Sequence, residues 1–231
     1  MFQATGPEPG LKWQSLASIL RQSYPNVTGM LDVACRDALG TLVLTLLSQS
    51  TTDRQAQAAY ASLRKAFPRW EQVLAAKPRD VAEHIKAGGL NQQKAVRIQA
   101  ILARLQDEAG ALSLAWLAKK SPAAAREFLL SLPGVGPKTA ACVLLFSFDM
   151  PALPVDTHVA RLSRRLGLVS LKASPAQIQQ ELEAMVPPEA ARHFHLALIE
   201  HGRAICRPRR PRCDDCRLAS ACEYEKESLP R

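Results

Sequence analysis

The chain has 231 residues, 47% of them hydrophobic, which is enough apolar surface for a folded core and excludes a disordered chain. A formal net charge of +9 indicates a polyanionic partner such as DNA, RNA or an anionic membrane, although a basic protein without such a partner would carry the same charge. Aromatic residues make up only 5%, which disfavours binding to single strands by extensive base stacking.

The sequence contains no recognisable targeting or membrane segment. Residues 1–10 are rich in Gly and Pro and lack the apolar core of a signal peptide. The apolar run from Thr41 to Leu47 is too short to cross a bilayer. We therefore expect a cytoplasmic protein in which the six cysteines are thiols or metal ligands rather than disulfides.

Apolar residues recur at helical spacing along the chain, and no segment shows the period of two expected for a strand, so the predicted fold class is all-α. Three helix starts have clear signals: Thr51 or Thr52 as a cap, Ser121 before Pro122, and the capping-box pair Ser174 and Gln177. The predicted helices cover about 11–20, 38–47, 53–67, 95–105, 122–130, 157–166, 174–185 and 188–206.

Four cysteines near the C-terminus lie in a polar segment that has too little apolar content for a core of its own. They follow the pattern C-x6-C-x2-C-x5-C and are Cys206, Cys213, Cys216 and Cys222. Such a loop can wrap four thiolates around a metal centre that organises it. Structural zinc sites usually use two short C-x2-C pairs. Only one pair is present, so the spacing favours a [4Fe–4S] cluster over the zinc alternative.

The other two cysteines, Cys35 and Cys142, stand in apolar stretches and are predicted to be buried thiols. Arginines are dense around the four-cysteine segment. One or two of them could simply balance the thiolate charge, and we expect the rest to contact phosphate. These arginines are Arg203, Arg207, Arg209, Arg210, Arg212 and Arg217.

The string LPGVGPKTA at 132–140 is predicted to join two helices through a tight turn. Gly134 and Gly136 permit close approach of another molecule, and Pro137 can begin the second helix. The unpaired N–H groups at that helix start can hold an anion, and a DNA phosphate fits there. An ordinary helix–helix turn is the plainer alternative, which the complete string disfavours.

Lys138 lies in the first turn of this second helix, where the helix dipole disfavours a positive charge. A neutral amine there could form a Schiff base with a sugar carbon, and a lysine that only contacts phosphate is an equal alternative. Asp156 follows eighteen residues later and has the plain interpretation of an N-cap. The intervening turn could also bring its carboxylate to the lysine, where it could accept a proton or stabilise a sugar cation.

These motifs, namely LPGVGPKTA, VDTHVAR, HGRAIC and the four-cysteine pattern, together resemble the endonuclease III family of helix–hairpin–helix DNA glycosylases, over residues of about 30 to 224. The resemblance implies a six-helix barrel with the hairpin at 31–150 and a [4Fe–4S] domain built from 1–30 and 151–231. It also implies a nucleoid-associated monomer that acts on double-stranded DNA containing damaged bases or abasic sites, with the damaged nucleotide flipped out.

The resemblance implies a bifunctional enzyme of base excision repair that removes oxidised pyrimidines and cleaves at the abasic site by β-elimination. Lys138 matches the Schiff-base nucleophile, Asp156 matches the catalytic aspartate, and the four cysteines match the cluster ligands. Either Gln49 or Ser50 would fill the gap left by the flipped base, and Leu90 would wedge between bases, unless it is only a partly buried loop residue. The full set expected to contact DNA is Gly134, Val135, Gly136, Ser50, Gln49, Leu90, His158 and Arg203.

Other interpretations of these motifs assign a different substrate or a different class of protein. Removal of thymine or uracil from mismatches remains open, because pocket residues set the substrate. A non-catalytic iron–sulfur protein that binds DNA or senses redox state is a further alternative, which the joint presence of Lys138 and Asp156 disfavours. The adenine-removing branch carries an additional C-terminal domain, for which the nine residues after Cys222 leave no room. Residues 111–121 form an insertion relative to compact members of the family, and its effect is open.

Overall fold

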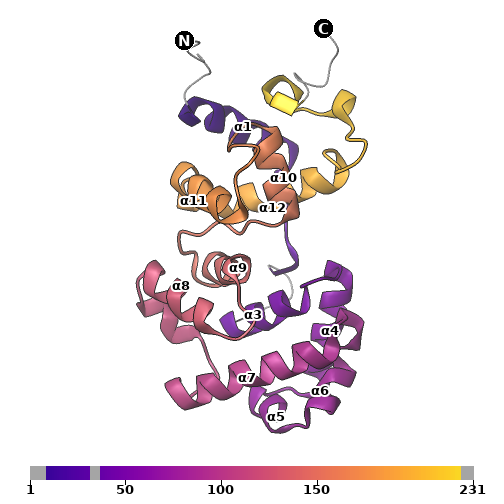
Figure 1. The fold of residues 1–231 in the computed structure, drawn as a ribbon, viewed down its shortest axis with the longest axis vertical. Helices are drawn as coiled ribbons and strands as arrows, with labels where there is room; N and C mark the ends of the chain where they lie inside the picture. Colours follow the sequence, from indigo (N-terminus) through magenta and orange to yellow (C-terminus); the bar gives the residue numbers. More distant parts are fainter. Residues whose placement is uncertain (1–8, 32–36, 225–231) are drawn as a thin grey trace. The chain divides into compact units, whose positions relative to one another are not determined.

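The computed structural model describes residues 9–31 and 37–224 and confirms the predicted all-α class (Figure 1). Within these described ranges the regular structure is entirely helical, without a strand. Cys35 and residues 1–8, about which the sequence made predictions, lie outside the described residues. None of the described helices is long and apolar enough to cross a membrane. The chain divides into two compact units, one of residues 29–150 and one that combines residues up to 28 with 151–231.

The unit of residues 29–150 is built around α3, in which all ten residues are buried. Helix α3 packs against α4, α7 and α9, and α7 also packs against α5 and α6. The short helices α5 and α6 were not predicted; their buried anchors are Trp70, Val73 and Val81. The helices are α3 (Ala38–Leu47), α4 (Asp53–Ala66), α5 (Trp70–Ala75), α6 (Pro78–His84), η1 (Lys86–Gly88), α7 (Asn91–Ala109), η2 (Ala115–Lys119), α8 (Pro122–Ser131) and α9 (Pro137–Phe148).

Local capping explains where several of these helices begin. The Thr52 hydroxyl accepts a hydrogen bond from the Gln55 backbone N–H, and the two residues form a capping box. Ser121 caps α8 by accepting from the Ala124 N–H, as predicted. Gly110 ends α7 with φ 66°, a left-handed conformation that suits glycine.

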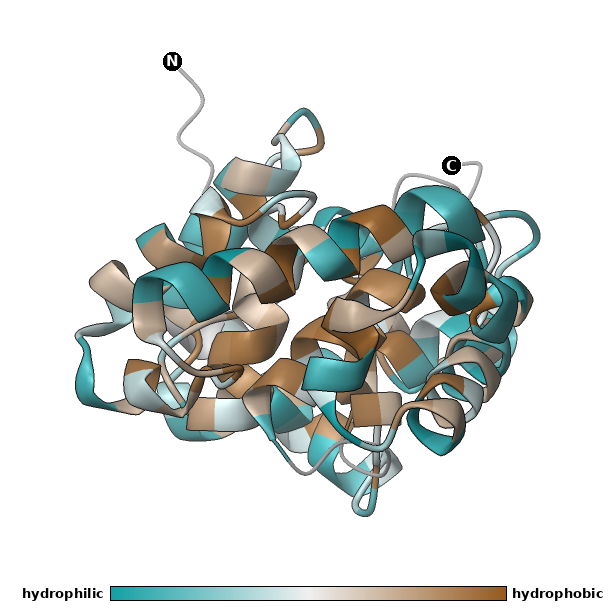
Figure 2. Ribbon diagram, turned by 90° about the horizontal axis from the view of Figure 1, so that it is seen from below, coloured by the Kyte–Doolittle hydropathy of each residue, from teal (hydrophilic) through white to brown (hydrophobic). Residues whose placement is uncertain are grey.

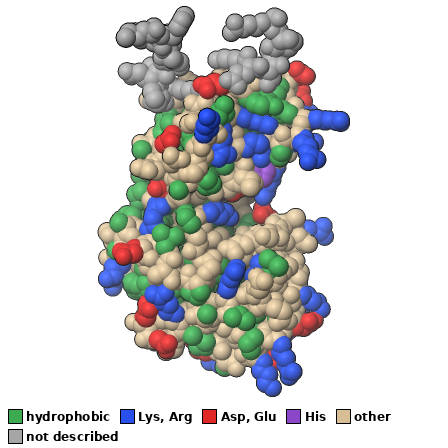
Figure 3. All heavy atoms as spheres, in the orientation of Figure 1, with side chains coloured by type: hydrophobic (Ala, Val, Ile, Leu, Met, Phe, Trp, Pro, Cys, Tyr) green, Lys and Arg blue, Asp and Glu red, His purple; other side chains and the backbone are tan. Residues whose placement is uncertain are grey.

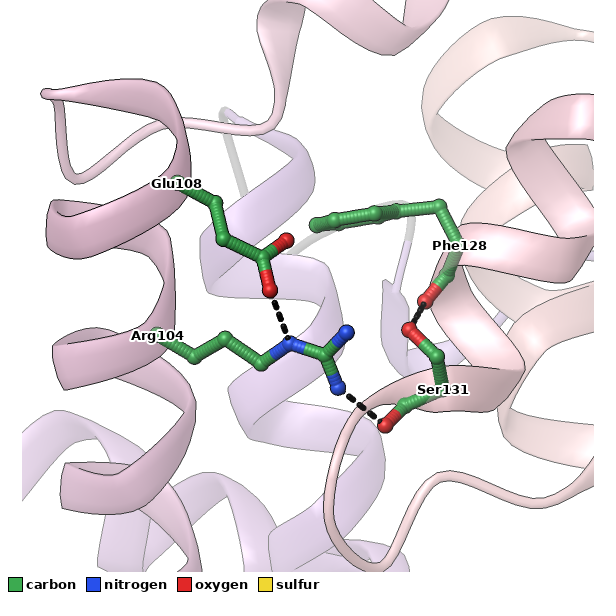
Figure 4. Close-up of polar contacts among 4 residues, drawn as sticks. All are labelled: Arg104, Glu108, Phe128 and Ser131. Atoms are coloured by element: carbon green, nitrogen blue, oxygen red, sulfur yellow. Dashed lines mark hydrogen bonds and ion pairs between the residues drawn. The ribbon is translucent and has the colours of Figure 1, made fainter.

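A polar bridge joins the middle of α7 to the end of α8 (Figure 4). Arg104 Nε donates to Glu108 at 2.7 Å, and the same guanidinium donates to the backbone oxygen of Ser131. The Ser131 hydroxyl donates to the Phe128 carbonyl at 2.6 Å. Because these bonds satisfy carbonyls in the last turn of α8, they hold the chain directly before the glycine turn.

The other unit contains α1 (Pro9–Ser23), α10 (Thr157–Arg165), α11 (Pro175–Met185), α12 (Pro188–Ala204), η3 (Cys213–Asp215) and η4 (Ala219–Ala221). Helix α12 packs against α1 and α10. The Trp13 and Phe194 rings meet edge to face with their centroids 4.8 Å apart. The capping box of Ser174 and Gln177 is present, as predicted. The helices turn apolar faces inward and polar faces outward, as Figure 2 shows by hydropathy.

Candidate functional site

The turn between α8 and α9 contains two glycines, of which only Gly134 is required by the fold. Gly134 has φ 75°, and a Cβ there would lie 2.8 Å from Arg97 Cδ. It therefore needs glycine both for its backbone conformation and for space. Gly136 is the N-cap of α9 and has extended backbone, and a Cβ there would meet nothing within 4 Å. Val135 between them is buried, so the turn presents backbone rather than side chain at Gly136.

Lys138 is half-buried and stands directly after Pro137, the first residue of α9. It makes no hydrogen bond or ion pair with the described residues of its own unit. Thr139 and Ala140, which follow, are buried against the rest of that unit. The amine of Lys138 is thus held at the positive end of a helix without a counter-ion from its own unit, an arrangement that suits a nucleophilic amine.

Two loops with strained residues belong to the same unit. Ser50 is exposed and has φ 57°, and Leu90 is 55% exposed with φ 47°. Non-glycine residues in this left-handed region are uncommon and are concentrated at functional sites. The Gln49 side chain donates to the Gly134 carbonyl at 3.3 Å and to Thr139 Oγ1 at 3.4 Å. It therefore connects its loop to the glycine turn, while Ser50 and Leu90 remain at the surface.

Asp156 is the N-cap of α10, and its carboxylate accepts a hydrogen bond of 2.8 Å from the Val159 N–H. The plain cap role considered for this residue is therefore present. One carboxylate oxygen makes this bond, and the side chain is only half-buried. Lys138 and Asp156 belong to different units, so their pairing is part of the proposal below.

His158 lies in the first turn of α10, next to the chain of α12. Burial lowers the pKa of His158, and the negative charge of nearby Asp156 offsets part of this decrease. Its Nδ1 lies 3.2 Å from Arg161 Nη2, and a Cβ at Gly202 would lie 2.6 Å from the same nitrogen. Glycine at 202 is therefore needed for α12 to pack against His158. Arg203, the next residue, is exposed.

The four C-terminal cysteines line one pocket together with Arg165 and Tyr224. All four are thiols rather than disulfides, as predicted. Burial, together with the neighbouring sulfurs, raises the pKa of the Cys216 thiol to about 11. In the described part of the chain, no three His, Cys, Asp or Glu side chains converge closely enough to hold one metal ion.

Sequence reasoning missed two arginines of α10 that support this loop. Arg165 donates to Cys206 Sγ at 3.2 Å and to the carbonyl of Arg207 at 2.9 Å, and its guanidinium stacks on the Tyr224 ring. Arg161, one turn earlier, donates to the backbone oxygens of Cys206 and Gly202. Their spacing of four residues on one helix was visible in the sequence, but their targets lie about forty residues away.

His201 was missed as well. It is buried on α12, which lowers its pKa to about 4, so the ring is neutral near pH 7. Its Nδ1 lies 2.9 Å from the Tyr24 hydroxyl and its Nε2 lies 3.5 Å from Cys216 Sγ. The tautomer with Nε2 protonated satisfies both contacts, because Nδ1 then accepts from Tyr24 and Nε2 donates to sulfur.

Basic side chains are numerous on the visible face around the C-terminal segment of this unit (Figure 3). Arg212 forms an ion pair with Asp215 at 2.6 Å, so part of its charge is balanced within the loop. All six arginines noted in the sequence are exposed: Arg203, Arg207, Arg209, Arg210, Arg212 and Arg217. Exposed arginines of this kind are the side chains that most often contact phosphate.

Comparison with known proteins identifies the class to which this fold and these residues belong. Residues 43–188 match the model of the HhH-GPD superfamily of base excision DNA repair proteins. The chain is 37% identical over 188 residues to endonuclease III of Thermotoga maritima, covering 81% of this chain and 84% of that protein. It is 40% identical over 168 residues to a putative DNA glycosylase of Arabidopsis thaliana, covering 73% of this chain but only 57% of that relative.

A solved structure of a trapped covalent intermediate between endonuclease III and DNA superposes with a TM-score of 0.82. The two chains are 26% identical, and the match covers 98% of this chain and 99% of the other. The chain therefore belongs to the HhH-GPD superfamily and, within it, to the endonuclease III family, which confirms the resemblance found in its motifs. It is a DNA glycosylase of base excision repair.

Proposed function

We propose that this glycosylase is bifunctional: it removes oxidised pyrimidines from double-stranded DNA and then cleaves the strand at the abasic site, with Lys138 as nucleophile. The observation that carries the proposal is Lys138 itself, an amine at the start of α9 with no counter-ion among the described residues of its unit, directly after an open glycine turn. The similarity to an endonuclease III that was trapped covalently on DNA supports the same chemistry.

In the proposed reaction the damaged nucleotide leaves the base stack. Lys138 Nζ forms a bond to C1′ while the bond from C1′ to the base breaks. The Asp156 carboxylate stabilises the developing positive charge of the sugar and takes up the proton that Nζ loses. The base leaves with the electron pair of the broken bond. The Asp156 carboxylic acid then passes its proton to O4′ as the sugar ring opens, which gives a protonated imine between Nζ and C1′. Loss of a proton from C2′ then expels the 3′ phosphate by β-elimination.

The proposed pairing of Lys138 with Asp156 requires two domains that close on the same nucleotide. We propose that these are 31–150 and the combination of 1–30 with 151–231, acting as a monomer in the cytoplasm on nucleoid DNA. The glycine turn and the exposed arginines would hold phosphates, and His158 would add a further contact. Ser50 and Leu90, exposed and strained, are the residues proposed to enter the stack.

Trapping with borohydride tests the proposal, because the reagent reduces an imine to a stable crosslink. We expect the wild-type protein to crosslink to duplexes that contain thymine glycol or an abasic site. Release of thymine or uracil from mismatches, without release of thymine glycol, would instead assign the mismatch-specific substrate class. DNA binding without crosslinking to any damaged duplex would favour the non-catalytic iron–sulfur protein.

We propose that the four cysteines hold a [4Fe–4S] cluster. The donor set fits, because four thiols line one pocket and cysteine thiolates are the usual ligands of such a cluster. The cluster carries net positive iron charge that would keep all four sulfurs as thiolates, which burial otherwise disfavours at Cys216. Cys206, Cys213, Cys216 and Cys222 would be its ligands. Its proposed role is to hold the arginine-rich loop in shape.

Asp156→Asn separates the proposed catalytic role from the cap. Asparagine caps a helix as well as aspartate does, so we expect an unchanged melting temperature. It cannot take up the proton, so the single-turnover rate of base release is expected to fall by about 10²–10⁴-fold. Asp156→Ala should in addition cost about 0.5–2 kcal/mol of stability through loss of the cap. Wild-type base release by the asparagine variant would leave Asp156 with the cap role alone.

Gly136→Ala tests whether the glycine turn approaches DNA. The added methyl group meets no protein atom, and the backbone is extended, so the fold accepts it. Alanine is the poorer N-cap, which lowers the free energy of unfolding, but it also reduces the conformational freedom of the unfolded chain, which raises it. Each effect is about 1 kcal/mol or less, so the two largely cancel. We expect unchanged thermal stability with about tenfold weaker binding to an abasic-analogue duplex, a loss of about 1.4 kcal/mol, measured by fluorescence anisotropy. Unchanged affinity would place the phosphate elsewhere.

A further inference from the structure

Lys94 on α7 is a buried lysine that the reaction described above does not use. It is 2% exposed. Its ammonium donates three hydrogen bonds of 2.7 Å each, to the backbone oxygens of Leu47, Gln49 and Gly88. An ammonium has three N–H donors, so the side chain is fully satisfied by these carbonyls. Burial lowers its pKa, and nearby Arg97 lowers it further.

The three acceptors lie in the two loops that carry the strained residues. Leu47 is the last residue of α3, and Gln49 directly precedes Ser50. Gly88 ends η1, two residues before Leu90. One buried side chain therefore connects two loops that are about forty residues apart in sequence. The bonds lie immediately before the positions where the backbone enters the left-handed region.

The same contacts extend to the glycine turn. Gln49, whose carbonyl is held by Lys94, donates through its side chain to Gly134 and Thr139. One turn after Lys94 on α7, the Arg97 side chain lies against Gly134. The two loops and the turn before Lys138 are therefore tied to one face of α7.

This arrangement is a costly way to stabilise a core. Burying an ammonium requires removal of its water, and in the described residues Lys94 has no carboxylate to compensate the charge. An apolar side chain of the same length would avoid that cost in a helix that is otherwise buried by Ile98, Ile101 and Leu105. The hydrogen bonds of the ammonium fix the relative positions of the three loop carbonyls, and an apolar side chain could not do this.

We propose that Lys94 is a positioning residue: it holds the Ser50 and Leu90 loops in the one geometry that lets both enter the DNA stack when the damaged nucleotide leaves it. This inference rests on the proposed function, because it assigns the two loops to DNA. Lys94 itself touches neither DNA nor the reacting sugar. Its effect is on the pre-organisation of groups that do, which lowers the entropy lost on forming the reactive complex.

The test compares Lys94→Met with Leu105→Ala. Methionine is as flexible as lysine, only one atom shorter, and has no donor. Leu105 is buried on the same helix, eleven residues or about three turns after Lys94, so its truncation lowers stability at a distance from the three carbonyls that Lys94 holds. Each variant is assayed at a temperature well below its own melting point. The readouts are single-turnover release of thymine glycol and the fluorescence of 2-aminopurine placed opposite an abasic analogue, which rises when that base is unstacked.

We expect Lys94→Met to lose the fluorescence increase and to release the base about 10²-fold more slowly at saturating enzyme. Binding to the abasic-analogue duplex should change far less, because the glycine turn and the arginines are intact. Leu105→Ala should keep both the fluorescence signal and the rate. Lys94→Gln, which is shorter but retains two donors, should fall between wild type and Lys94→Met, and it carries the test if the methionine variant does not fold.

Two results would overturn the inference. One is a wild-type rate and fluorescence signal for the Lys94 variants. The other is a loss in the Lys94 variants that Leu105→Ala reproduces at the same loss of melting temperature, which would make Lys94 a structural residue only. Failure of the proposed function looks different, because the wild-type protein would then release no oxidised pyrimidine and form no borohydride crosslink.

Discussion

Lys138→Gln is expected to reduce borohydride crosslinking to background and base release by about 10³-fold or more, while DNA binding survives. Glutamine keeps a polar side chain that is one atom shorter, but its amide is not a nucleophile. Stability should not fall. Lys138 makes no hydrogen bond within the described part of its unit, and its positive charge opposes the dipole of α9, so its removal is expected to add about 0.3–1 kcal/mol. Calorimetry and trapping on an abasic duplex measure the two effects together.

The matched control is Lys65→Gln in the last turn of α4, where the lysine is exposed and its charge is favourable to the helix dipole. This variant should crosslink as wild type does and lose a few tenths of a kcal/mol. Crosslinking that survives in Lys138→Gln, and disappears only when a different lysine is replaced, would transfer the nucleophilic role to that lysine.

Cys213→Ala is expected to remove the broad visible absorbance of the purified protein and to release the loop of residues 206–222. That loop has little apolar content, and cysteine-bound metal centres contribute on the order of 10 kcal/mol to folding. Without the cluster, nothing else of comparable strength holds the arginine-rich segment. Limited digestion with trypsin should then cut rapidly after Arg209, Arg212 and Arg217, which the intact loop protects. Absorbance spectra and the masses of the fragments report the two effects.

Cys142→Ala is the control, because Cys142 is a buried thiol of α9 in the other unit. It should lose stability as a small core truncation does, while the absorbance and the protection of the loop remain. Iron and sulfide in the wild-type protein, measured by elemental analysis, are expected at cluster stoichiometry. A colourless protein with one zinc per chain would overturn the cluster and restore the zinc alternative.

Features that depend on neighbouring residues could be read from the sequence. The caps at Thr52, Ser121 and Ser174 were predicted because each cap bonds a backbone N–H three residues ahead, within one turn. The apolar spacing predicted the longer helices for the same reason. The short helices α5 and α6 were not predicted, because six or seven residues are too few to show a clear helical periodicity. Motif order along the chain was enough to identify the family, which the comparisons confirm.

The side chains that hold the loops and the cysteine segment in place could be identified only from the tertiary structure. Lys94, Arg161, Arg165 and His201 have ordinary sequence surroundings, and their partners are mostly backbone oxygens or a sulfur at distant positions. Every residue carries a backbone carbonyl, so such an acceptor leaves no mark in a sequence. The sequence by itself could therefore determine the longer helices, the cysteine spacing and the family, and it supplied the candidates for the reactive groups. Which side chains hold those groups in position depends on how helices distant in the chain pack. Only this packing brings a donor to a particular backbone carbonyl, and the residue type gives no indication of which carbonyl that will be.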